Sequence, residues 1–198
     1  MSARKGTVER NTRETQIKLS VNIDGTGKYS VETGVPFLNH MLELFSRHSL
    51  IDLELKASGD IDVDYHHLVE DIGLALGTAL DQALGDRRGI RRYGFSAIPM
   101  DEALASVVVD LGGRPYLVKK MACTKLKLME FELALFTDFF QAFVVQARMN
   151  LHIDQTRGEE AHHAYEAVFK GLARAMRMAC ETDPRDSGIP SSKGRIGD

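Results

Sequence analysis

Apolar and polar residues alternate along the chain with two different periods. Residues 15–23 (TQIKLSVNI) and 51–57 (IDLELKA) alternate at every second position, which is typical of strands with one buried face. Residues 36–48 place apolar side chains three or four positions apart, which is typical of an amphipathic helix. The same criteria predict further strands at 28–33, 93–98, 103–111, 115–122 and 149–155, and further helices at 66–84, 131–147 and 160–180.

The predicted elements occur in two similar sets. Residues 37–45 (FLNHMLELF) align with 135–143 (LFTDFFQAF), and the polar residues fall at the same places. The following strands align at the same spacing, and after a short gap the segment HHLVE aligns with HHAYE. We infer a tandem duplication of a unit of roughly 90 residues, and therefore an α+β fold with one sheet and two helices in each unit. The division is 1–90 for the first half, 91–182 for the second half and 183–198 for a C-terminal tail.

Composition and charge narrow the class of protein. The 198 residues carry a formal net charge of −3, which gives no general attraction to nucleic acid or to an anionic membrane. The two cysteines lie outside any CxxC pair, which favours a reducing compartment over a disulfide scaffold. The N-terminal segment is polar, and no apolar run is long enough to span a bilayer. We therefore expect a cytoplasmic protein.

The candidate chemistry lies in two copies of the motif HHxxE, at 66–70 and 162–166, which use four of the 7 histidines. On a helix, residues four apart share a face, so His66 and Glu70 can hold one ion. The adjacent His67 points about 100° away and can reach another ion. Each motif therefore serves two metal ions, and two facing motifs predict a pair of sites related by pseudo-twofold symmetry.

The duplication predicts how the ligands divide between the two ions. The repeat partners His40 and Asp138 precede the two motifs and complete the sets. Imidazole with carboxylate suits manganese, iron or zinc. One predicted set is His66, Glu70, His163 and Asp138, and the other is His162, Glu166, His67 and His40.

Structural roles remain as alternatives for several of these residues. A single histidine pair is usually a surface or helix-start feature, and His40 alone would suit a satisfied buried histidine. His48 and His152 lie outside the symmetric set. Because His152 aligns with Glu54 on a polar strand face, a structural role is favoured for it.

Several long motifs follow one another in order and cover nearly the whole length of the chain: RNTRET at 10–15, GVPFLNHML at 34–42, DYHHLVEDIGLALG at 64–77, PMDEALASVVVDLGGRP at 99–115, EAHHAYEAVFKGLARA at 160–175 and IPSSKG at 189–194. In these motifs the chain resembles the imidazoleglycerol-phosphate dehydratases of histidine biosynthesis. The resemblance implies a duplicated fold like that of ribosomal protein S5 domain 2, with helices between two packed sheets. It also implies two Mn²⁺ ions per active site and a homo-oligomeric shell of about two dozen subunits, with active sites where subunits meet.

By resemblance, the metal ligands divide as the duplication predicts, and the chain departs from the family at two places. Asp138 stands where the family often has histidine, and a carboxylate can also bind manganese. Gly158, Glu159 and Glu160 stand where the family commonly has GKN, so its lysine contact to phosphate is absent or supplied differently.

The implied reaction is loss of water from imidazole glycerol phosphate, giving imidazole acetol phosphate. The catalytic carboxylates by resemblance are Glu14, which matches the acid/base group, and Glu166. From sequence alone, Glu14 would be an exposed charge, Arg92 part of a solvated turn and 189–194 a disordered tail. The implied substrate-binding residues are Glu14, His48, Arg92, Arg114, Lys170, Ser192 and Lys193.

Two other functions fit the clusters. A binuclear phosphoester hydrolase would use the metal ions to bind an attacking water beside the phosphorus. A protein without enzymatic activity would use them only to hold an assembly together. Neither alternative gives a role to Glu14 or to the tail motif.

Overall fold

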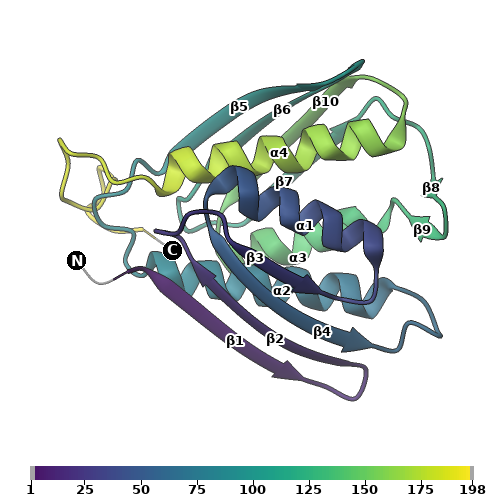
Figure 1. Cartoon of the computed structure of the whole chain (residues 1–198). Helices are drawn as coiled ribbons and strands as arrows, with labels where there is room; N and C mark the ends of the chain where they lie inside the picture. Colours follow the sequence, from purple (N-terminus) through teal and green to yellow (C-terminus); the bar gives the residue numbers. More distant parts are fainter. Residues whose placement is uncertain (1–2, 197–198) are drawn as a thin grey trace.

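Two 4-stranded sheets of the same topology form the outer layers of the computed structural model, which describes residues 3–196 (Figure 1). The first sheet has the order β1-β2-β4-β3 and the second β5-β6-β10-β7. In each sheet the last strand pair is parallel and the others are antiparallel. The strands are β1 (Lys5–Asn11), β2 (Thr15–Asn22), β3 (Tyr29–Glu32), β4 (Asp52–Gly59), β5 (Tyr93–Met100), β6 (Ala103–Asp110), β7 (Tyr116–Met121) and β10 (Asn150–Arg157).

The helices lie between the two sheets and interlock the two repeats. α2 packs on the first sheet and α4 on the second, whereas α1 packs mainly against α4 and α3 against α2. All four helices begin at the same end of the molecule, the right-hand end in Figure 1. The helices are α1 (Pro36–Ser49), α2 (His66–Leu84), α3 (Leu135–Ala147) and α4 (Ala161–Cys180), and a small hairpin of β8 (Lys127–Leu128) and β9 (Phe131–Glu132) precedes α3. The expected α+β fold with helices between two sheets is confirmed.

Glycines at equivalent places allow each long helix to approach its sheet. A Cβ atom on Gly6 in β1 would lie 1.9 Å from the carbonyl oxygen of Ala79 in α2. A Cβ atom on Gly94 in β5 would lie 1.9 Å from the carbonyl oxygen of Ala175 in α4. No side chain fits such a gap, so both repeats use glycine for the same close contact.

Four differences from the sequence-based prediction have physical causes. β1 was not predicted because it is an edge strand whose residues are mostly exposed, so its pattern lacks apolar alternation. The turn signal DGTG at 24–27 favours a hairpin of β3 with β2, but β3 pairs in parallel with β4 instead. α3 begins at Leu135 rather than at residue 131, because the preceding residues form β8 and β9, which were also missed.

The connector between the repeats is anchored by a buried arginine. The side chain of Arg87 is 2% exposed and forms an ion pair of 2.5 Å with Asp81. Its Nη atoms also donate to the carbonyl oxygens of Leu111, Ala147 and Arg148 at 2.8–2.9 Å. A guanidinium in a buried site needs such partners because it has left water. Arg87 therefore ties α2 to the end of α3 and to the segment after β6.

We expect Arg87→Met to lower the free energy of unfolding by about 3 kcal/mol, because it leaves Asp81 and three carbonyl groups without their donor. Urea unfolding followed by circular dichroism measures this change. Arg88→Met is the matched control, since Arg88 makes an exposed ion pair with Asp86. Equal shifts for both variants would contradict the anchoring role.

None of the helices among residues 3–196 has the length and hydropathy to cross a membrane.

Candidate active site

The histidines singled out by the duplication lie in the first two turns of three helices. His40 belongs to α1, His66 and His67 begin α2, and His162 and His163 lie at the start of α4. Because the helices begin at one end of the molecule, these side chains are brought to that end from segments far apart in the chain (Figure 1).

Three of the predicted ligands converge on one point. His40 Nε2 lies 2.9 Å and His162 Nε2 lies 3.0 Å from the same oxygen, Oε1 of Glu166. One ligand atom from each residue lies within 4.8 Å of the other two. Two imidazole nitrogens and a carboxylate oxygen in this arrangement fit a divalent manganese, iron or zinc ion. The contact between α1 and α4 assembles this group from both repeats.

The carboxylate at the centre of this cluster is held ionised. Burial raises the pKa of Glu166, but hydrogen bonds from Lys170 and His40, together with the Lys170 charge, more than offset this and lower the pKa to about 2. Lys170, one of the predicted substrate-binding residues, forms an ion pair with Glu166 and also lies 3.4 Å from the sulfur of Met100. An ionised carboxylate is the form that binds a metal ion.

The second predicted set is only partly assembled. His66 Nε2 lies 3.7 Å from Glu70, and His66 Nδ1 lies 3.7 Å from Asp138 of α3. The two carboxylates therefore face different nitrogens of one ring rather than a common point. The approach of Asp138 to His66 agrees with its predicted place as repeat partner of His40.

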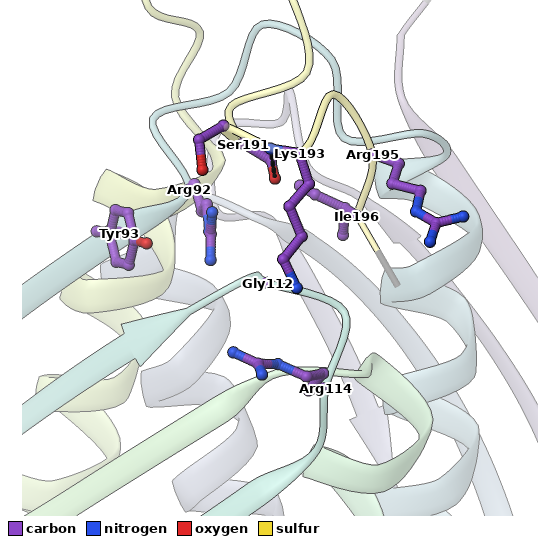
Figure 2. Close-up of a pocket in the computed structure, with 9 residues that line it drawn as sticks. Arg92, Tyr93, Gly112, Arg114, Ser191, Lys193, Arg195 and Ile196 are labelled. Carbon is purple, nitrogen blue, oxygen red and sulfur yellow. Dashed lines mark hydrogen bonds between the residues drawn. The ribbon is translucent and has the colours of Figure 1, made fainter. Parts of the chain in front are cut away.

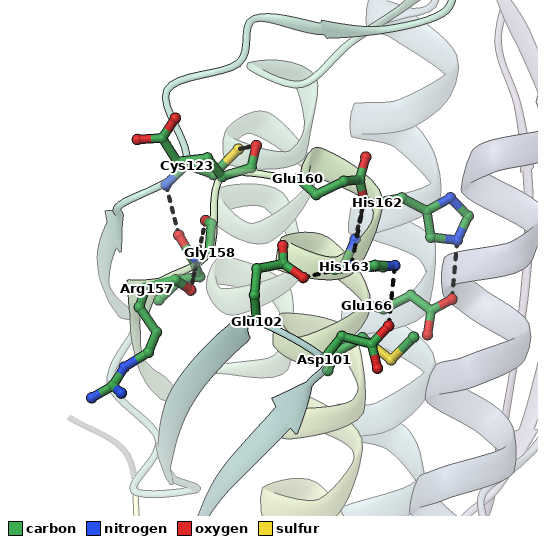
Figure 3. A network of polar contacts seen from close by, with 12 residues as sticks. Asp101, Glu102, Cys123, Arg157, Gly158, Glu160, His162, His163 and Glu166 are labelled. Atoms are coloured by element: carbon green, nitrogen blue, oxygen red, sulfur yellow. Dashed lines mark hydrogen bonds and ion pairs between the residues drawn. The ribbon is translucent and has the colours of Figure 1, made fainter.

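The second histidine of each motif points away from these clusters. His67 Nδ1 lies 3.0 Å from Asp60 and 4.0 Å from Glu14, and hydrogen bonding to Asp60 raises the pKa of His67. His163 Nδ1 lies 2.8 Å from Glu102, which raises the pKa of His163 (Figure 3). Within residues 3–196, the convergent cluster contains neither of them. Each predicted ligand set therefore lacks one histidine inside a single chain.

A basic pocket lies at the other end of the molecule. It has a volume of about 270 Å³, and the C-terminal tail forms part of its wall (Figure 2). Lys193 extends from the tail toward Gly112 and Arg114. The pocket contains the predicted residues Arg92, Arg114, Ser192 and Lys193, and also Ser191 and Arg195. Arg195 was not predicted, although a further cation two residues after Lys193 was a usable signal.

Arg92 holds the tail beside the sheet. Its Nε and Nη2 atoms donate to Asp110 at 2.6 and 3.1 Å, and this ion pair raises the pKa of Arg92. Its Nη1 atom donates to the carbonyl oxygen of Pro190 at 2.8 Å. In the structure, therefore, Arg92 is not simply part of a solvated turn.

The cluster and the pocket are too far apart to serve one small molecule within a chain. The backbone N–H of Arg92 donates to the carbonyl oxygen of Ala179, near the end of α4, whereas His162 lies at the start of α4. The helix between them rises by about 25 Å. His48 lies between these ends, half-buried on α1, where burial and the charges of Lys170 and Arg174 lower its pKa.

Two other residues from the sequence analysis lie outside both regions. His152 is exposed on β10, with its ring centroid 6.4 Å from that of Tyr116. The side chain of Glu159 is exposed, and its backbone carbonyl oxygen accepts from the Cys123 thiol at 3.5 Å.

The duplicated fold gathers imidazole and carboxylate groups at one end and cations around a pocket at the other. Such a combination is typical of an enzyme that acts on a small molecule. A sequence model described as "Imidazoleglycerol-phosphate dehydratase" matches residues 33–176, and the chain belongs to this family. It is accordingly a dehydratase of histidine biosynthesis, a hydro-lyase.

Relatives and solved structures agree with this assignment. The imidazoleglycerol-phosphate dehydratase of Geobacter metallireducens is 55% identical over 194 residues, which is 98% of this chain and 100% of that protein. The crystal structure of the dehydratase from Staphylococcus aureus has a TM-score of 0.82 and 41% identity, covering 90% of this chain and 99% of that one. The structure from Pyrococcus furiosus, in complex with (S)-C348, has a TM-score of 0.83 and 34% identity, covering 96% of this chain and 100% of that one.

Proposed function

We propose that the chain catalyses the metal-dependent dehydration of D-erythro-imidazole glycerol phosphate to imidazole acetol phosphate, with two Mn²⁺ ions per active site. The observation that carries the metal dependence is the convergence of His40, His162 and Glu166 on one point. Bound divalent ions would supply positive charge that stabilises electron density pushed into the imidazole ring. One ion would be held by His40, His67, His162 and Glu166, and the other by His66, Glu70, Asp138 and His163.

Glu14 is proposed to move the proton. It lies in the turn between β1 and β2, is exposed, and is 4.0 Å from His67 Nδ1. A carboxylate beside a ligand histidine can take a proton from the carbon chain and return one to the departing hydroxyl. Water is lost, and the enol that remains becomes the ketone. Glu166 is proposed to act from the ligand set, where it stays ionised.

The phosphate is proposed to bind in the basic pocket. Arg114 and Lys193 are exposed there, and Ser192 adds a hydroxyl group. This would give the tail, residues 183–198, a part in the active site. Because Glu159 offers no cation, the phosphate contact made by lysine in the family is proposed to come from this pocket. His48 and Lys170 are proposed to contact the part of the substrate that lies between its imidazole ring and its phosphate group.

Complete active sites are proposed to form only between subunits of a homo-oligomer in the cytoplasm, with the shell of about two dozen subunits implied by the resemblance. Each ligand set lacks His67 or His163 within one chain. In addition, the pocket lies about 25 Å from the cluster along α4, much farther than the length of the substrate. A neighbouring subunit would supply both the missing histidine and the pocket. Each repeat half, 1–90 and 91–182, would then contribute to both metal sites.

The test is an assay of chelator-stripped protein with imidazole glycerol phosphate, with and without added Mn²⁺, following both the ketone and inorganic phosphate. We expect ketone formation that depends on Mn²⁺, without release of phosphate. Phosphate release would favour a binuclear hydrolase. Bound Mn²⁺ without turnover would indicate a structural role for the metal ions. The departures from the family at Asp138 and Glu159 would then account for the missing activity.

A further inference from the structure

The duplication gives Glu14 a counterpart in the second repeat. Glu14 directly precedes β2, and Glu102 directly precedes β6. The two hairpins have the same register, because Gly6 pairs with Val21 in the first, and their equivalents Gly94 and Val109 pair in the second. Counted from these pairs, Glu14 and Glu102 hold the same position in the fold.

The two carboxylates make different contacts with the histidine beside them. Glu102 Oε2 lies 2.8 Å from Nδ1 of His163, which is a hydrogen bond. Glu14 Oε2 lies 4.0 Å from Nδ1 of His67, which is too far for one. Equivalent residues therefore have different roles: one is bonded to its histidine and the other is not.

A different residue is hydrogen-bonded to the Nδ1 atom of His67. Asp60 Oδ2 lies 3.0 Å from it, so within the described residues each of the two histidines has one carboxylate hydrogen-bonded to Nδ1. Asp60 follows Gly59, which pairs with Thr15 at the start of β2. The equivalent glycine is Gly158, which lies against Ala103 at the start of β6, and the residue after it is Glu159. The carboxylate that is hydrogen-bonded to Nδ1 of His163 is Glu102, from the β5–β6 turn, rather than Glu159.

We propose that Glu102 is a positioning residue for His163, and that this leaves Glu14 as the carboxylate free to transfer protons. The hydrogen bond fixes the ring and its tautomer, with Nδ1 bearing the proton and Nε2 presented for ligation, as carboxylates do for metal-binding histidines. In Figure 3, Glu102 approaches His163 from the turn between β5 and β6, and Asp101 of the same turn lies 3.7 Å from Nε2. This inference rests on the proposed function.

The proposed active site is therefore pseudo-symmetric in its ligand positions, apart from His40 and its repeat partner Asp138, and asymmetric in its acid/base chemistry. Two positioning carboxylates, Asp60 and Glu102, serve His67 and His163. Dehydration takes one proton from carbon and gives one to the leaving hydroxyl, and a single carboxylate can do both in turn. Of the equivalent pair Glu14 and Glu102, Glu14 is the one available for this, because Glu102 is engaged with His163.

The experiment compares Mn²⁺ binding and turnover in Glu102→Gln with the wild-type protein, both purified as assembled protein and then stripped of metal. Calorimetric titration with Mn²⁺ measures affinity without turnover. We expect affinity for one of the two ions to fall by about tenfold or more, because the ring loses the charged partner that orients it. Asp60→Asn is expected to lower the affinity for the other Mn²⁺ ion to a similar extent. Glu102→Asp, which keeps the charge, is expected to lose less affinity than Glu102→Gln.

Glu130→Gln is the matched control, since Glu130 is an exposed residue in the turn between β8 and β9. Wild-type affinity for both ions in Glu102→Gln would overturn the inference. Unchanged affinity with turnover lowered a hundredfold would also overturn it and would make Glu102 an acid/base group. If the wild-type protein itself fails to bind two ions or to form the ketone, the proposed function fails, which is a separate outcome.

Discussion

Glu14→Gln is expected to lower kcat by roughly 10³-fold while leaving the affinity for Mn²⁺ unchanged. The amide keeps the size of the side chain but cannot accept a proton from carbon. Glu14 is exposed, and its nearest ionisable partner, His67, already has Asp60 at its Nδ1 atom, so the substitution disturbs no ligand. The measurement is steady-state formation of the ketone at saturating Mn²⁺, together with a metal titration of the stripped protein.

Glu9→Gln provides the control for Glu14→Gln. Glu9 is an exposed glutamate on β1 of the same hairpin. We expect the Glu9→Gln variant to retain the wild-type kcat. A kcat for Glu14→Gln within a factor of about three of wild type would remove Glu14 from the proton transfer. A large loss of Mn²⁺ affinity would instead mean that Glu14 acts through His67.

Co-expression of His40→Asn with His67→Asn is expected to restore activity that each variant lacks alone. In the structure His40 lies with His162 and Glu166, whereas His67 points toward Asp60. If a complete site combines the cluster of one subunit with His67 of another, a mixed assembly contains sites in which both histidines are intact. With equal and random mixing, roughly a quarter of the sites are of this kind. The assay is ketone formation by assemblies purified through two different tags.

The control for this experiment pairs His40→Asn with His162→Asn. These two residues contribute to the same cluster within one chain, so no mixed site contains both intact, and no activity is expected. Absence of restoration in the His40 and His67 mixture would place the whole ligand set in a single subunit. Restoration in the control would mean that His40 and His162 of one site come from different subunits, against the cluster seen in the structure.

The pattern of residues was sufficient for the helices that carry the site. The predicted boundaries of α2 agree with the structure, and those of α1 and α4 agree within one residue, because these helices have clear apolar faces. The alignment of the two repeats also predicted that Asp138 would be near His66, and the structure places them 3.7 Å apart. The exposed edge strand β1 had no such pattern and was missed, although it leads into the turn that carries Glu14.

The sequence by itself determined which side chains are available and how they repeat: imidazole and carboxylate groups at helical spacing, in two copies. Helical periodicity is a local property, so it can be read from neighbouring residues. The duplication had already grouped His40 with Glu166, but only the tertiary structure decided that α1 packs on α4, which is the contact that brings the two side chains together. The tertiary structure also decided that Glu102, rather than the residue aligned with Asp60, holds His163. These contacts join residues 61 or more positions apart, and they depend on how sheets and helices pack together rather than on any local pattern.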